Sequence, residues 1–106
     1  METLDKKEYL NQLFDLYEPL LTDKQRLYFE HYYKEDYSLQ EISELYQVSR
    51  NAIFDHLKKV EEHLIDFEKK LKLLELKNKR LELIKKIEET KDLNLVEELR
   101  KLDESW

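Results

Sequence analysis

The sequence predicts an all-α fold in which a small bundle, built around a helix-turn-helix, is followed by a long helix. The composition supports this, because the 106 residues include no glycine and one proline, and 42% of them are charged. Apolar residues recur at helical spacing along most of the chain. In addition, residues 38–57 contain two short helical patterns joined by a three-residue turn.

An apolar stripe at i, i+3, i+4 and i+7 predicts a first helix with Thr3 as its N-cap and with a buried side formed by Leu10, Leu13, Phe14 and Tyr17. Pro19 is expected to end or bend this helix, because proline lacks an amide hydrogen. Thr22 is expected to cap a second helix that continues through Tyr33. Aromatic residues along the second helix are expected to pack in the core rather than stack on bases: Tyr28, Phe29, Tyr32 and Tyr33.

The helix-turn-helix is expected over residues 38–58. Ser38 and Glu41 form a capping-box pattern that marks the start of its first helix. Ser49 is the expected N-cap of its second helix, because its hydroxyl can accept an amide hydrogen one turn further on. In this motif the second helix presents its outer N-terminal side chains to a groove or a partner, while its inner side chains hold the scaffold.

Beyond Ile53 the helix is expected to continue as a coiled coil, because apolar residues follow an alternating spacing of three and four. Asn78 falls within this seam and is expected to pair with its counterpart on a second chain, which favours a homodimer. The predicted dimerisation residues are Leu64, Phe67, Leu71, Leu74, Asn78 and Leu81.

The regular spacing fails at Lys85 and Glu88, where the helix is expected to bend, end or change partner. Asp92 or Asn94 can cap a last short helix. As the intramolecular alternative to dimerisation, this tail could fold back on the long helix to make a hairpin, and the sequence alone does not separate the two. The expected domains are therefore a bundle over residues 1–60 and an extension over residues 61–106.

The net charge of −6 argues against indiscriminate nucleic-acid binding, but the positive charge is concentrated on the long helix. Residues 69–86 carry eight basic side chains and two acidic ones. One interpretation is an electrostatic surface for structured RNA or another partner, and an equally open one is a solvated face laced with i, i+4 ion pairs. The RNA- or partner-binding set under the first interpretation is Lys69, Lys70, Lys72, Lys77, Lys79 and Arg80.

A resemblance to known families follows from these patterns. Residues 21–64 resemble the C-terminal helix-turn-helix of bacterial sigma factors, whose pattern is matched by Leu21, Phe29, Tyr33, Ser38, Glu41, Ile42, Val48, Ser49, Ile53 and Leu57. The whole chain resembles the small YlxM family of helix-turn-helix proteins. That resemblance implies a cytoplasmic protein of Gram-positive type bacteria that acts in or regulates the signal recognition particle pathway, with the particle's RNA or GTPase as partners.

Some residues depart from the sigma-like pattern, and these departures affect how far DNA binding can be expected. The residues expected to contact DNA are Ser49, Arg50, Asn51, His56 and Lys58. Gln47 and Asp36 replace common glycines, and a left-handed Gln47 would cost about 1 kcal/mol or more. Phe54 and Asp55 are unsuited to a DNA groove and indicate either a protein contact or a face covered by the appended helix. A transcriptional regulator that binds DNA is the alternative function.

Catalysis has little support in the sequence. Without glycine there is no phosphate-cradling loop or nucleophile elbow of the usual kind, and the absence of cysteine excludes thiolate chemistry. The catalytic candidates reduce to His31, His56 and His63, which are expected to be packed or solvated rather than to hold a metal. No cofactor, membrane span or signal peptide is expected.

Overall fold

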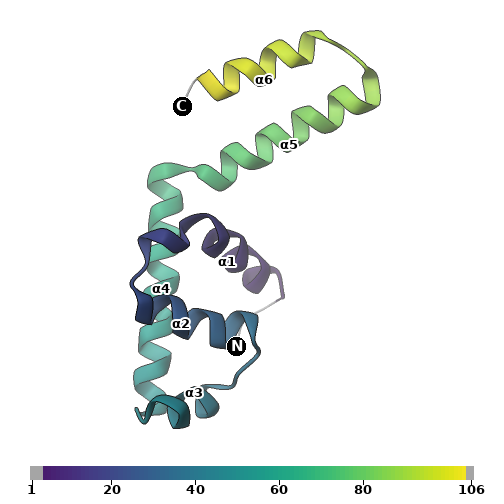
Figure 1. Ribbon diagram of the computed structural model, residues 1–106. Helices are drawn as coiled ribbons and strands as arrows, with labels where there is room; N and C mark the ends of the chain where they lie inside the picture. Colours follow the sequence, from purple (N-terminus) through teal and green to yellow (C-terminus); the bar gives the residue numbers. More distant parts are fainter. Residues whose placement is uncertain (1–3, 105–106) are drawn as a thin grey trace. The chain divides into compact units, whose positions relative to one another are not determined.

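The computed structural model describes residues 4–104, and Thr3, the expected first N-cap, lies outside this range. The described residues form helices joined by short turns, and none of them belongs to a β-strand. The chain divides into two compact units, residues 1–71 and residues 72–106. The predicted all-α class is confirmed (Figure 1). None of the described helices is both long enough and apolar enough to cross a lipid bilayer.

In the first unit, α4 runs beside the three shorter α-helices and packs against each of them (Figure 1). The elements of this unit, in chain order, are α1 (Leu4–Tyr17), a 3-10 turn (Glu18–Leu20), α2 (Asp23–Phe29), a π-helical turn (Glu30–Lys34), α3 (Leu39–Tyr46) and α4 (Arg50–Leu71). The turn that contains Pro19 separates α1 from α2, as expected of a residue that cannot donate to a helix interior.

Side-chain caps set the starts of α2 and α3. The Thr22 hydroxyl accepts from the Gln25 amide, and the Gln25 side chain accepts from the Thr22 amide, at 3.2 and 2.9 Å. Ser38 and Glu41 make the same reciprocal pair at 3.0 and 3.1 Å. Each pair satisfies two amides that have no partner within the helix, so both helix starts are determined by local sequence.

Aromatic rings fill the centre of the first unit. Phe29 is fully buried, and its ring stacks on Phe14 and on Tyr33, both at 4.5 Å between centroids. Around this stack lie apolar side chains of α1 and of the inner face of α4, including Leu10, Leu13, Val60 and Leu64. The prediction of core packing is confirmed for Tyr28, Phe29 and Tyr33, whereas Tyr32 is only partly buried.

A second buried cluster joins the two helices of the helix-turn-helix to α2. It consists of Tyr28, Ile42, Ile53 and Leu57, each no more than 4% exposed. Burial of each such side chain contributes about 1.5–3 kcal/mol, so the cluster holds α3 at a defined angle on α4. The predicted helix-turn-helix is present.

The turn of the motif passes through Gln47, which adopts the left-handed conformation with φ 54° and ψ 45°. Its amide donates to the carbonyl of Ser43, and the Ser43 hydroxyl donates to the carbonyl of Val48 at 2.5 Å. Asp36 is also left-handed, with φ 59°. The chain therefore makes both turns without glycine, at a cost of about 1–2 kcal/mol for each residue.

The prediction of one continuous helix beyond Ile53 is wrong, because α4 ends at Leu71. Lys72 adopts a left-handed conformation, with φ 56° and ψ 34°, which ends the i to i−4 hydrogen bonding of α4. The next helix, α5 (Leu73–Thr90), continues through Lys85 and Glu88. The expectation that a helix could end at these two residues is therefore also wrong.

In the second unit, α6 (Asn94–Glu104) packs against α5, so the tail folds back as a hairpin. Asp92 caps α6 by accepting from the Asn94 amide at 3.0 Å. Arg80 of α5 pairs with Asp103 of α6 at 3.2 Å. The fold-back alternative is therefore the arrangement that the second unit adopts.

We expect the Gln47→Gly variant to increase the free energy of unfolding of the first unit by about 1 kcal/mol, because glycine adopts the left-handed conformation without a Cβ clash. All seven tyrosines lie between residues 1 and 71, so urea unfolding followed by the near-ultraviolet tyrosine signal reports on this unit. Gln40→Gly, within α3, is the matched control and should be destabilising by about 1 kcal/mol. A loss of stability in Gln47→Gly would contradict the prediction.

Candidate functional site

The first turn of α4 projects from the helix-turn-helix with its polar side chains exposed. Ser49 caps it, since its hydroxyl accepts from the Ala52 amide at 3.0 Å. Arg50 and Asn51 follow and are exposed, whereas Ile53 is fully buried and points into the core. The buried side holds the helix in place, so Arg50 and Asn51 are available to a partner.

Of the five residues predicted to contact nucleic acid, the structure leaves Ser49, Arg50, Asn51 and Lys58 exposed but not His56. The His56 ring packs on the edge of Tyr28, with 4.7 Å between centroids, and its Nε2 atom is buried without a hydrogen-bond partner among the described residues. Burial lowers the pKa of His56 below its usual 6.5, and the charges of Lys24 and Lys59 lower it further. His56 therefore supports the scaffold.

The charge on α4 is mixed where a DNA-binding helix is normally basic. Residues 50–66 carry three basic and four acidic side chains. Phe54 is 54% exposed, and Asp55 and Glu62 are also exposed. Carboxylates close to a phosphate backbone weaken binding, so the first turn of α4, which carries Arg50 and no carboxylate, is better suited to DNA than the turns that follow.

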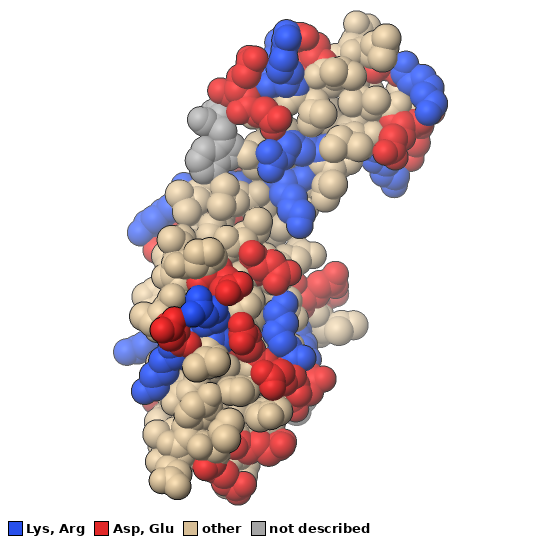
Figure 2. Space-filling view, viewed as in Figure 1, with Lys and Arg blue, Asp and Glu red and all other residues tan. Residues whose placement is uncertain are grey.

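The predicted basic set is divided between the two units. Lys69 and Lys70 end α4, whereas the other four residues belong to the second unit. Lys70 pairs with Asp66 at 2.9 Å, and Lys79 pairs with Glu75 at 3.1 Å, both at i, i+4 spacing. Such i, i+4 pairs are what the second interpretation of the basic run, a solvated helix face with ion pairs along it, predicts. Figure 2 shows blue and red side chains interspersed on the face that it displays.

The residues predicted to form a dimer seam have different environments. Leu64 is fully buried within the first unit, and the Phe67 ring lies 5.9 Å from that of Tyr17. Leu71 and Leu81 are 40% and 53% exposed. Asn78 is exposed, and Leu74 is buried. Because α4 uses Leu64 for its own core, the seam is not available as one continuous strip.

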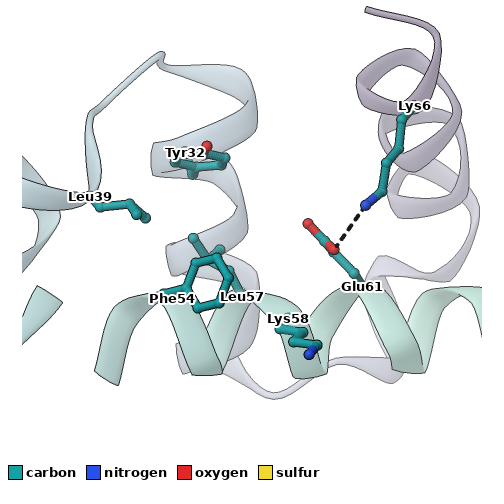
Figure 3. Close-up of a pocket in the computed structure, with 7 residues that line it drawn as sticks. All are labelled: Lys6, Tyr32, Leu39, Phe54, Leu57, Lys58 and Glu61. Carbon is teal, nitrogen blue, oxygen red and sulfur yellow. Dashed lines mark ion pairs between the residues drawn. The ribbon is translucent and has the colours of Figure 1, made fainter. Parts of the chain in front are cut away.

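A pocket of about 160 Å³ opens in the first unit beside the exposed ring of Phe54 (Figure 3). Its residues come from α1, the π-helical turn, α3 and α4: Lys6, Tyr32, Leu39, Phe54, Leu57, Lys58 and Glu61. Sequence reasoning missed the residues from α1, the π-helical turn and α3, because nothing local relates them to α4. The one signal in the sequence is the outward position of Phe54 on an otherwise polar helix face.

The histidines considered as catalytic candidates serve in packing. The His31 ring lies with Nε2 2.6 Å from the Tyr46 hydroxyl, and the His63 ring stacks on Phe67 at 6.2 Å. Residues 4–104 contain no group of three or more His, Asp or Glu side chains placed to hold a metal ion.

The fold and the exposed start of α4 define a helix-turn-helix protein. The chain belongs to the family described as "Putative helix-turn-helix protein, YlxM / p13 like", whose model matches residues 4–104.

Curated relatives match the chain over nearly its whole length. It is 49% identical to UPF0122 protein OB1530 of Oceanobacillus iheyensis over 100 residues, which cover 93% of this chain and 95% of that protein. It is 42% identical to UPF0122 protein YlxM of Bacillus subtilis over 109 residues, which cover 95% of this chain and 99% of that protein.

We expect the first unit to become less stable as the pH falls below about 6.5, the usual pKa of a histidine. Because the folded-state pKa of His56 is lowered, the unfolded chain binds the proton more readily, and protonation favours unfolding between the two pKa values. The His56→Phe variant keeps a ring against Tyr28 but cannot titrate, so it should lose this part of the pH dependence.

Urea unfolding at about pH 7.5 and about pH 5 measures the difference, since these values lie on either side of the normal histidine pKa. His63→Gln, which alters an exposed histidine on the same helix, is the control and should keep the pH dependence that His56 contributes. An equal loss of stability on acidification in the parent protein and in His56→Phe would show that His56 is not responsible.

Proposed function

We propose that this protein is a non-enzymatic, cytoplasmic accessory or regulatory protein of the signal recognition particle pathway, which binds the particle's RNA, its GTPase or both. The pathway comes from the resemblance to the YlxM family. The structural observation that supports binding is the exposed start of α4, where Arg50 and Asn51 stand clear of the core.

The RNA contact in this proposal depends on exposed cations rather than on a base code. The chain carries a net charge of −6, so it gains little from non-specific attraction to phosphates. Lys69, Lys72 and Lys77 are exposed and take no part in ion pairs within residues 4–104. These lysines can bind phosphates without first breaking an ion pair.

The alternative is a transcriptional regulator that binds DNA through Arg50, Asn51 and Lys58. Arginine can pair with guanine and asparagine with adenine in a major groove, and both side chains stand in the first turn of α4. Against it stand the exposed Phe54 and Asp55 on the next turn. This is why DNA binding is the second candidate.

We also propose a homodimer that uses the exposed members of the predicted seam. Leu81 is 53% exposed on α5, and the neighbouring Ile84 is 38% exposed. Two such strips can cover one another, which removes apolar surface from water.

We expect a salt titration to reveal binding to signal recognition particle RNA at low ionic strength, with the slope of log affinity against log salt set by the number of phosphates contacted. Affinity should fall by at least about tenfold when the six cations of the basic set are lost, because each contact releases counterions. The variant changes to glutamine Lys69, Lys70, Lys72, Lys77, Lys79 and Arg80.

The matched control removes the same amount of charge outside residues 69–86, by changing to glutamine Lys7, Lys24, Lys34, Lys59, Lys91 and Lys101. An equal loss of affinity in both variants would show that only net charge matters. Undetectable RNA binding even at low salt would refute the RNA contact. Tight binding to a discrete promoter, lost in Arg50→Ala and Asn51→Ala, would favour the DNA-binding alternative.

We expect the parent protein to sediment as a dimer and the Leu81→Glu variant to shift toward the monomer, because a carboxylate in an apolar contact is strongly unfavourable. Sedimentation equilibrium over a range of concentrations measures this. Leu45→Glu, which alters a side chain 56% exposed on α3, is the control and should leave the mass unchanged. A monomeric parent protein throughout the range would rule out the dimer.

A further inference from the structure

The pocket beside Phe54 is the right size for one side chain. Its volume of about 160 Å³ lies well below the roughly 300–1,000 Å³ of clefts that enclose cofactors and drug-sized ligands. Pockets that anchor protein partners are smaller and hold a single bulky residue near the centre of an interface. The volume therefore favours an anchor side chain over a small-molecule ligand.

The lining of the pocket is apolar on one side and charged on the other. Figure 3 shows Tyr32, Leu39 and Phe54 facing the same space, with Lys6 and Glu61 on the opposite side. Phe54 is 54% exposed, so a partner that covers this ring removes apolar surface from water. Aromatic walls of this kind pack well against another ring.

The charged side of the pocket leaves one cation for a partner. Lys6 lies 3.7 Å from Glu61, so these two charges largely cancel. Lys58 is exposed and forms no ion pair within residues 4–104. The pocket thus combines an apolar recess with a single available ammonium group, which is complementary to an apolar residue flanked by one carboxylate.

A nucleic acid fits this surface less well. Tyr32 and Phe54 could stack on a base, but a strand brings a phosphate with every nucleotide, and Glu61 lines the pocket while Asp55 and Glu62 are exposed on the same helix. Repeated phosphates would meet these carboxylates, whereas one carboxylate needs only Lys58.

We propose that the pocket between α4, α1, α3 and the π-helical turn is a docking site for a partner protein, which inserts one bulky apolar side chain beside Phe54 and pairs a neighbouring carboxylate with Lys58. This inference adds a protein-binding pocket on the first unit, which the proposed function does not locate, and it holds whichever nucleic acid the protein binds.

The test is a nuclear magnetic resonance titration of the full chain with the peptide acetyl-Ser-Phe-Ser-Glu-Ser-amide. Saturable shifts are expected at the amides of Leu39, Phe54, Leu57 and Lys58. A peptide with alanine in place of its phenylalanine should bind at least about tenfold more weakly, because the anchor is lost. One with glutamine in place of glutamate should bind about twofold to fivefold more weakly, as for an exposed ion pair.

Matched protein variants localise the effect. Phe54→Ala should weaken binding at least about tenfold, as for loss of an anchor contact, whereas Leu45→Ala, which shortens a side chain of similar exposure on α3, should not. Lys58→Gln should weaken binding about twofold to fivefold, and Lys59→Gln should not. All four positions are exposed, so the free variants should keep the spectrum of the folded parent protein.

Three results would overturn the proposal. One is the absence of shifts at the pocket with millimolar peptide. Another is shifts at Phe54 with a uridine hexanucleotide but not with the peptide, which would assign the pocket to a base. The last is a concentration-dependent shift at Phe54 without any peptide, which would assign it to a second copy of the chain.

Discussion

Burial of the inner face of α4 is the interaction on which the first unit depends. The buried side chains on this face are Ile53, Val60 and Leu64, which are fully buried, and Leu57, which is 4% exposed. One face of α4 therefore packs against α1, α2 and α3. The same packing decides which residues are left over for function. This packing fixes the rotation of α4 about its axis, so that Arg50 is exposed and His56 packs against the core. It also buries Leu64 within the chain, so that Leu64 is not available for a contact between chains.

The surface that results carries acidic and basic side chains in comparable numbers. Several described cations of the first unit have a carboxylate within ion-pairing distance, as Lys6 has Glu61 and Lys7 has Asp36, and the molecule as a whole is acidic. Attraction to a polyanion therefore has to come from a few cations, and a contact with a protein needs only one or two. This balance makes the docking pocket that we propose and the proposed limited contact with nucleic acid compatible on one small chain.

Several residues adopt the left-handed conformation in this glycine-free chain. Asp36, Gln47, Lys72 and Lys91 all have positive φ among the described residues. Each costs about 1–2 kcal/mol relative to glycine, so the surrounding structure must hold it in place. At Gln47 that support is a buried cluster on both sides of the turn. Lys72 and Lys91 bound α5, and so set the length of the helix that forms the hairpin with α6.

What the sequence by itself determined is local. The N-caps at Thr22, Ser38 and Ser49 and the turn at Pro19 follow from residues within a turn or two of one another, where hydrogen bonding decides the outcome. The helical spacing of apolar residues also identifies which aromatic side chains are buried. Tertiary structure decided the break at Lys72, the inward rotation of His56 and the pocket beside Phe54. A heptad pattern records only that one side of a helix is apolar, and which neighbour covers that side depends on contacts between segments far apart in the chain.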